Sequence, residues 1–160
     1  MLRVVTIGVY GWDLGSFLEA LRAADVRLLL DVRQRRGVRG REYSWANSLR
    51  LQRALAEAGV DYEHHPELAP TTELRHLQYA EDARQGVGKR SRMELAREYR
   101  ARYAYEILDR VDLQALGQEL TQQGSSALFC VERDAAACHR SIIAARLATV
   151  HGAVVTDLRP

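Results

Sequence analysis

The chain has 160 residues, 47% of them hydrophobic and 28% charged, a composition typical of a folded globular protein that excludes a disordered chain. No apolar run approaches the roughly 20 residues that a transmembrane helix needs, and no signal-peptide pattern opens the sequence, so we expect no membrane partner. Two cysteines without an export signal predict a cytoplasmic protein with reduced thiols, and the length predicts a single domain over residues 1–160.

The first half of the chain alternates apolar runs with amphipathic segments. A short apolar run predicts a strand over residues 4–8, and Asp13 is the predicted N-cap of a helix that ends near residue 24. The nearly continuous apolar run 26–32 is typical of a central strand that is covered on both faces. Ser44 is the predicted N-cap of a helix over 45–58, and a third strand follows over 60–64.

The second half is mostly helical by its periodicity. Helices are predicted over 72–84 and 91–111, the second from apolar residues at i, i+4 spacing, and Asp112 is the predicted N-cap of a helix that ends near 123. A strand over 126–131, a helix over 141–150 and a last strand over 153–158 complete the chain. This alternation predicts an α/β fold: a single three-layer domain with a mainly parallel sheet of about five strands and helices on both faces.

Arginine supplies almost all of the positive charge. The formal net charge is only +2, but 22 of the 23 basic residues are arginine, and Lys89 is the one lysine. The planar guanidinium of arginine suits phosphates and carboxylates. Two stretches concentrate this charge. The first contains Arg33, Arg35, Arg36, Arg39 and Arg41, and the second contains Arg84, Lys89, Arg90, Arg92, Arg97, Arg100 and Arg102.

The tetrapeptide Cys138-His139-Arg140-Ser141 is the most informative local feature. It lies where a predicted buried strand leads into a helix, and the N–H groups and dipole of a helix N-terminus attract anions. It indicates either an anion site with Arg140 as partner or a reactive Cys138 thiolate that acts as a nucleophile. The alternative is structural: Cys138 packs the first helical turn while His139 and Arg140 bind water or nearby carbonyls.

Ligands of parallel sheets bind beyond the carboxyl ends of the strands, and the tetrapeptide is predicted to lie on that side. We therefore expect one cavity there. The residues predicted to bind an anion are Gly8, Arg33, Arg140 and Ser141. The residues predicted to carry the chemistry are Asp31, Glu67, Glu132, Cys138 and His139. Each carboxylate has a structural alternative, because it could cap a loop or pair with one of the many arginines.

Five segments carry a family resemblance. They are Thr6-Ile7-Gly8, Asp31-Val32-Arg33, residues 62–68, Phe129-Cys130-Val131-Glu132 and Cys138-His139-Arg140. In this order they resemble the domain-of-unknown-function family 488. Val9-Tyr10 and Ala69-Pro70 depart from the family's pattern, so no family role is carried over to those positions. The resemblance implies the fold, and the family has no established activity that it could add.

Histidines and cysteines raise the question of a metal site, but their spacing argues against one. Structural zinc sites usually take cysteines two to four residues apart, whereas seven residues separate Cys130 from Cys138. His64 and His65 are adjacent late in a strand and point to opposite faces, so at most one of them could join His139. We therefore expect no metal and no cofactor, and a disulfide between the two cysteines stays possible.

Three functional classes remain. The favoured one is an enzyme, a hydrolase or transferase, that acts on a phosphate-bearing small molecule such as a nucleotide or on a nucleic-acid-related substrate. The alternative is a non-catalytic nucleic-acid-binding module whose contacts come from Arg35, Arg36, Arg39, Arg41, Lys89, Arg90 and Arg92. The second alternative is rhodanese-like sulfur transfer, in which a loop from a thiol closes with Arg-Ser, although the span from Cys130 to Ser141 is long for such a loop.

Overall fold

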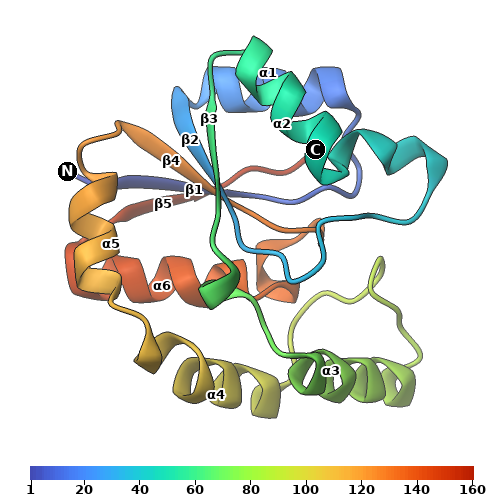
Figure 1. Cartoon of the computed structure of the whole chain (residues 1–160). Helices are drawn as coiled ribbons and strands as arrows, with labels where there is room; N and C mark the ends of the chain where they lie inside the picture. Colours follow the sequence, from blue (N-terminus) through green and yellow to red (C-terminus); the bar gives the residue numbers. More distant parts are fainter.

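A computed structural model describes all residues, 1–160, and its centre is one sheet of five parallel strands in the order β3-β2-β4-β1-β5 (Figure 1). The strands are β1 (Arg3–Ile7), β2 (Val26–Asp31), β3 (Asp61–His64), β4 (Ser125–Phe129) and β5 (Val154–Asp157). All five had been predicted from the apolar runs, and their bounds differ from the predicted ones by one or two residues at most ends.

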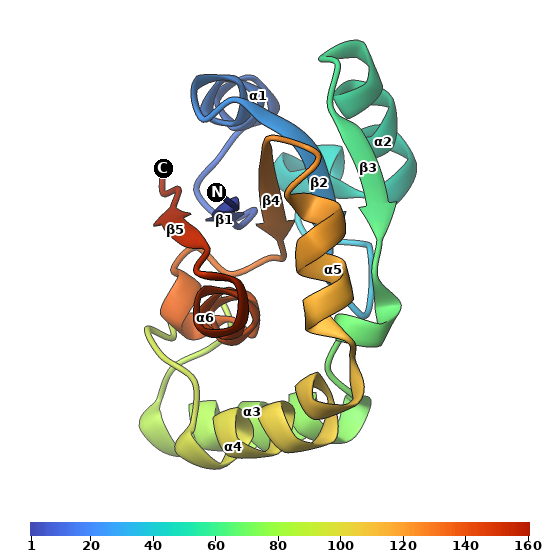
Figure 2. The same cartoon turned by 90° about the vertical axis from the view of Figure 1, so that its left-hand side faces the viewer.

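Helices cover both faces of this sheet. They are α1 (Leu14–Ala23), α2 (Ser48–Glu57), α3 (Thr72–Gln85), α4 (Arg97–Glu106), α5 (Leu113–Leu120) and α6 (Arg140–His151). Figures 1 and 2 show α1 and α2 on one face and α5 and α6 on the other, with α3 and α4 beyond them. The predicted three-layer α/β fold with a parallel sheet is therefore confirmed. No helix combines the length and hydrophobicity that crossing a bilayer requires.

The middle strand of the sheet, β4, comes late in the sequence. β4 lies between β1 and β2, and all of its residues are buried. Leu128 of β4 pairs with Thr6 on one side and Leu30 on the other. The helix that follows β1 and the helix that follows β4 cover opposite faces (Figure 2). The segments that leave the carboxyl ends of β1 and β4 therefore run to opposite faces of the sheet. Parallel sheets form a ligand-binding crevice at such a point.

Two of the predicted helix N-caps are confirmed. The Asp13 carboxylate accepts a hydrogen bond from the Ser16 amide at 2.7 Å, and Asp112 accepts one from the Ala115 amide at 3.0 Å. Each of these bonds satisfies an amide that has no partner inside the helix.

The helix predicted over 45–58 is shorter, and Ser44 does not cap it. Residues Arg41–Ala46 form a 3-10 helix, and α2 begins after Asn47, whose backbone is extended. Trp45 is buried against the Phe17 ring, with the ring centroids 4.8 Å apart. The Asn47 side chain accepts a hydrogen bond from the Val38 amide at 2.9 Å. Packing of the indole and this loop contact therefore interrupt the helical periodicity.

The helix predicted over 91–111 is also shorter, because α4 begins only at Arg97. Before it, the Arg92 guanidinium reaches the carboxylates of Asp82 and Glu132, and the Leu95 amide donates to the Ala136 carbonyl oxygen at 3.1 Å. These partners lie far away in the sequence. They hold residues 91–96 in a non-helical path that the local periodicity could not reveal.

Candidate functional site

A cavity of about 720 Å³ opens at the carboxyl ends of β1, β2 and β4. Its walls come from the segments that follow these strands, from α3, and from the loop between α3 and α4. A cavity of this size accommodates a ligand as large as a nucleotide. The structure thus has a pocket at the edge of the sheet where the strand order predicted one.

The lining of this cavity is strongly cationic. Its charged side chains, apart from histidine, are seven cations and one carboxylate, Glu132. The cations are Arg33, Arg35, Arg39, Arg75, Lys89, Arg90 and Arg92. Such an excess of one charge inside a concave surface concentrates ions of the opposite charge. The arrangement favours an anionic ligand.

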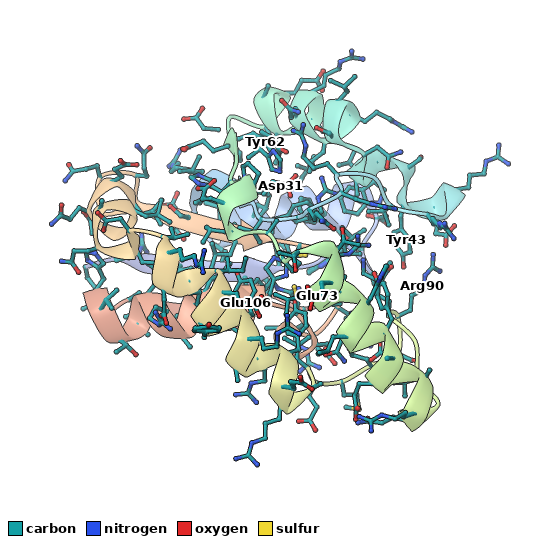
Figure 3. All side chains as sticks on the ribbon, turned by 60° about the horizontal axis from the view of Figure 1, so that its bottom comes forward. Asp31, Tyr43, Tyr62, Glu73, Arg90 and Glu106 are labelled. Carbon is teal, nitrogen blue, oxygen red and sulfur yellow. The ribbon has the colours of Figure 1, made fainter.

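The two basic stretches of the sequence meet at the mouth of the cavity. The Arg90 guanidinium donates to the Arg39 carbonyl oxygen at 3.0 Å. It also lies 5.1 Å from the centre of the Tyr10 ring and 5.3 Å from that of Tyr43. Figure 3 shows Tyr43 and Arg90 together at one corner of the molecule. Cation–π contacts of this kind hold the loop after β2 against the loop between α3 and α4.

The floor of the cavity carries two thiols and an imidazole. Cys130 follows β4, Cys138 precedes α6, and both are buried with free thiols. The Nδ1 atom of His139 lies 3.9 Å from the Cys130 sulfur and 3.7 Å from the Cys138 sulfur. The Nε2 atom of His139 lies 2.8 Å from the Val32 carbonyl oxygen. Since a carbonyl only accepts, Nε2 carries the hydrogen, and Nδ1 faces the sulfurs with its lone pair in the neutral ring.

The two thiols have opposite acid–base tendencies. Burial raises the pKa of Cys130 well above its usual value, and its interaction with Cys138 raises it further. Burial also opposes ionisation of Cys138, but a hydrogen bond from Cys130 and the charges of His139 and Arg140 lower the pKa of Cys138 well below its usual value. Burial lowers the pKa of His139, and the Cys138 charge more than offsets it, so that the pKa of His139 is raised.

Glu132 sits beside this floor in a buried chain of ion pairs. Its Oε1 accepts from Arg92 at 2.8 Å, and the same guanidinium donates to Asp82 at 2.7 Å. The other oxygen, Oε2, is buried without a hydrogen-bond partner. Burial and the negative charge of Cys138 raise the pKa of Glu132, although Lys89 and Arg92 oppose this rise. Glu132 therefore keeps one carboxylate oxygen that no protein group binds.

Lys89 is half-buried in the same wall. Burial by itself lowers the pKa of Lys89, but the Glu132 carboxylate and nearby thiol and phenol groups more than offset this, so that its pKa is raised. The ammonium group therefore stays charged inside the cavity.

A known protein family matches most of the chain. The sequence profile of "Domain of unknown function DUF488" matches residues 13–147. The chain belongs to this family. The family membership expected from five short segments is thus confirmed. No curated protein and no solved structure matches the chain.

In this DUF488 chain, Asp31 and Arg33 form a buried pair under the cavity. The Asp31 carboxylate accepts two side-chain bonds from Arg33, at 2.9 and 2.8 Å, and a third from the Tyr62 hydroxyl at 2.6 Å. Figure 3 shows Asp31 and Tyr62 side by side. Arg33 lines the cavity, whereas Asp31 does not. With its oxygens occupied, Asp31 orients Arg33.

Three predicted anion-binding residues lie outside the cavity lining of the DUF488 chain. Arg140 is fully buried, and it donates to the carbonyl oxygens of Glu132 at 2.7 Å and Arg133 at 3.2 Å. The Ser141 hydroxyl donates to the Cys138 carbonyl oxygen at 2.8 Å. At Gly8, a side chain would overlap the Glu132 carbonyl oxygen. Arg140 and Ser141 thus bind the loop after β4, and Gly8 lets this loop pass close to β1, while the cavity is lined by other residues.

The remaining predicted residues divide into two groups. Glu132, Cys138 and His139 lie together in the lining, as do Arg35, Arg39, Lys89, Arg90 and Arg92. Glu67, Arg36 and Arg41 lie elsewhere. Glu67 is half-exposed and accepts a 2.6 Å hydrogen bond from His65, and Arg36 donates to Tyr62 at 3.4 Å. The structure thus brings together the residues that follow β2 and β4 and leaves out the carboxylate after β3.

Sequence reasoning missed the wall that α3 contributes. Arg75, Gln78 and Tyr79 of this helix line the cavity, and Arg75 donates to the Tyr79 hydroxyl at 3.0 Å. Arg75 and Tyr79 share a helix face by their i, i+4 spacing, which was the available signal. Nothing in the sequence indicated that this face turns toward the sheet.

The two cysteines also lie closer together than their spacing in the sequence suggests. The 3-10 helix Ala135–Ala137 turns the chain back after β4, so Cys138 returns to Cys130. The donor atoms of Cys130, Cys138 and His139 lie within 4.8 Å of one another. The spacing argument against a metal site therefore does not hold for this DUF488 chain, because the loop geometry brings the donors together.

Proposed function

We propose that the protein is an enzyme that binds a phosphate-bearing substrate, a nucleotide or a nucleic-acid end, in the cationic cavity and catalyses a hydrolytic or transfer reaction at its floor. The observation that carries this proposal is the lining itself: seven arginine and lysine side chains against the single carboxylate of Glu132, above two thiols and an imidazole. Cationic side chains without buried partners bind phosphate oxygens through charge-assisted hydrogen bonds.

Three of the lining cations are available for this task. Arg33 and Arg92 are committed to buried carboxylates, Arg90 pairs with Glu42, and Arg75 bonds to Gln34 and Tyr79. The side chains of Arg35, Arg39 and Lys89 make neither an ion pair nor a hydrogen bond. Arg35 and Arg39 belong to the loop after β2, and Lys89 lies in the loop between α3 and α4. A phosphate held between these loops would be contacted from both sides. These three cations are therefore the proposed anion-binding groups.

Glu132 is the proposed proton carrier. It is the only carboxylate in the lining, and its Oε2 has no partner in the protein. General acid–base catalysis needs a carboxyl within hydrogen-bond reach of the reacting group, and Glu132 is the carboxyl that the cavity lining offers. Cys138 and His139 complete the floor below the reacting group. Asp31 has the positioning role described above, through Arg33.

The anion-binding site and the catalytic role of Glu132 can be tested separately, the first by ligand binding and the second by turnover. We expect nucleoside phosphates to bind in calorimetric titrations, and the double variant Arg35→Gln/Arg39→Gln to weaken that binding by about 10-fold or more, because a hydrogen bond to a charged group is worth about 1.5–3 kcal/mol. Arg53→Gln is the matched control, since Arg53 is an exposed arginine on α2 away from the cavity. Equal affinities for the double variant and Arg53→Gln would contradict the proposed anion site.

A catalytic test follows from a substrate screen with the bound nucleotides. Glu132→Gln keeps the shape of the side chain and removes its ability to carry a proton. We expect kcat to fall by about 10²-fold or more, with a smaller change in KM. Unchanged kcat in this variant would remove Glu132 from the mechanism.

A nucleic-acid-binding module is the second candidate, favoured by the contact between the two basic stretches. Arg90 joins them over the rings of Tyr10 and Tyr43, which gives the cavity mouth cations and aromatic faces together. This class predicts oligonucleotide binding that weakens steeply with salt and is unaffected by Glu132→Gln. Absence of oligonucleotide binding at low salt would exclude it.

A further inference from the structure

The side chains of Cys130, Cys138 and His139 bring three possible metal-ligand atoms close together, which anion binding does not require. We propose that the two sulfurs and the Nδ1 atom of His139 bind one zinc ion, with its fourth coordination position open to the cavity. All three side chains are buried, and all three line the cavity. The proposal rests on distances, ring orientation, charge and access.

The distances fit three ligands around a common centre. In a tetrahedral site with Zn–S near 2.3 Å and Zn–N near 2.0–2.1 Å, a nitrogen and a sulfur are about 3.6 Å apart. The observed separations from His139 Nδ1 are 3.7 Å to the Cys138 sulfur and 3.9 Å to the Cys130 sulfur. The two sulfurs lie within 4.8 Å of each other, so all three donors are already near the spacing that coordination requires.

The imidazole already has the orientation of a metal ligand. Its Nε2–H donates to the Val32 carbonyl oxygen at 2.8 Å, which leaves the Nδ1 lone pair directed at the sulfurs. Zinc-bound histidines almost always donate their second ring N–H to a carbonyl or a carboxylate, which fixes the tautomer and the ring plane. The bond to Val32 supplies this support from the neighbouring strand.

Hydrogen bonds within the protein already fix the backbone around the two cysteines. Arg140 bonds to the carbonyl oxygens of Glu132 and Arg133, so the loop that carries Cys130 is tied to the start of the helix that follows Cys138. Two thiolates and a neutral imidazole balance the charge of a divalent zinc ion. A neutral complex is compatible with a buried floor, whereas an isolated ion would carry a large desolvation cost.

The donor set selects among metals. Thiolate ligands favour zinc and other soft or borderline ions, while calcium and magnesium require oxygen ligands. Three protein ligands with a fourth position for water or substrate is the arrangement of catalytic zinc, whereas structural zinc has four protein ligands. A role for the open position in turnover rests on the proposed function, but zinc binding itself is independent of it.

Metal analysis of the reduced protein, purified without chelators and dialysed against zinc, tests the site. We expect one zinc ion per chain in the wild type and in Glu132→Gln, and essentially none in Cys130→Ser/Cys138→Ser. Circular dichroism must show that the double variant is folded. Wild-type protein that retains no more zinc than this folded double variant overturns the proposal.

Cobalt substitution tests the same site in the wild type alone, so a variant that fails to fold does not leave it undecided. Replacing zinc with Co²⁺ should give the intense visible bands of a tetrahedral complex and thiolate-to-cobalt charge-transfer bands in the near ultraviolet. A weak octahedral spectrum without charge transfer contradicts the site. Nucleotide titration of the zinc-free and zinc-loaded protein separates the two proposals: zinc binding without nucleotide binding overturns the proposed function alone, and the reverse result overturns the zinc site alone.

Discussion

The Nε2–H of His139 donates to the carbonyl oxygen of Val32 across 2.8 Å, although the two residues are 107 positions apart in the chain. Val32 lies between Asp31 and Arg33 at the end of β2, and His139 lies at the start of α6. This single bond therefore joins the two sequence segments on which a common site depends. The carboxyl rim of the sheet brings together the basic loop after β2 and the thiols after β4.

Asp31→Asn should destabilise the protein strongly, because it leaves the buried Arg33 guanidinium without its counter-charge. Both side chains are almost fully buried, with exposed fractions of 0% and 1%. Removing one partner of a buried pair costs about 3–5 kcal/mol. The control is Tyr62→Phe, which removes the hydroxyl's bonds with Asp31 and Arg36 but leaves the ion pair, and should cost about 1.5–3 kcal/mol. Urea unfolding measures both, and equal losses would contradict the assigned pairing.

Arg92→Met should also be costly, because it leaves the buried carboxylates of Asp82 and Glu132 facing each other without a cation. A loss of about 3–5 kcal/mol is expected, together with faster proteolysis of residues 86–96, which Arg92 anchors. Arg90→Met in the same loop is the comparison, since it removes an exposed ion pair with Glu42 and contacts with two tyrosine rings, and its loss should be smaller, about 1 kcal/mol. Comparable losses in the two variants would show that the buried network does not hold this loop.

Gly8→Ala should displace the segment that carries Glu132. A methyl group at Gly8 would overlap the Glu132 carbonyl oxygen, which is backbone and cannot swing aside. Overpacking of this kind costs about 1–3 kcal/mol. Gly88→Ala is the control, because no atom lies within 4 Å of its added methyl group, and it should be neutral or stabilising by about 0.4–1 kcal/mol. Thermal unfolding distinguishes the pair, and a stable Gly8→Ala protein would refute the close approach.

Alkaline pH should weaken the contribution of Tyr62. Burial raises the pKa of Tyr62 above its ordinary value of 10.0, and the hydrogen bond to Asp31 raises it further, although Arg36 opposes this. A pKa that is raised in the folded state stabilises the fold fully below the ordinary pKa, and this stabilisation is lost as the pH rises through the folded-state pKa. The stability difference between the wild type and Tyr62→Phe should therefore shrink in urea titrations as the pH rises above the ordinary pKa of 10.0. A difference that does not change with pH would contradict the shift.

Local signals were sufficient for the architecture. The apolar runs located all five strands, and the Asp13 and Asp112 side chains fixed two helix starts, because both kinds of signal depend on near neighbours. The segment before α4 shows where such reasoning ends. Its helical spacing is overridden by the bonds of Arg92 to Asp82 and Glu132, whose proximity is a property of the folded chain.

The site residues that could be predicted from the sequence are mainly those that follow a strand. The rule that ligands bind beyond the carboxyl ends of parallel strands led to Arg33, Glu132 and Cys138, which line the cavity. It also led to Glu67, which does not, because a strand end fixes the rim and not the direction of each side chain. The approach of Cys138 to Cys130 was left open only as a possible disulfide, since linear spacing does not describe a loop that doubles back.

The central place of β4 constrains how a newly made chain acquires its architecture. β1 has only β4 and β5 as partners, and both lie in the last quarter of the polypeptide. A fragment that stops before residue 125 thus has no partner strand for its N-terminal segment, and it retains only the pair β2–β3. Loop closure over such sequence separations slows folding, so synthesis must be almost complete before the sheet can assemble.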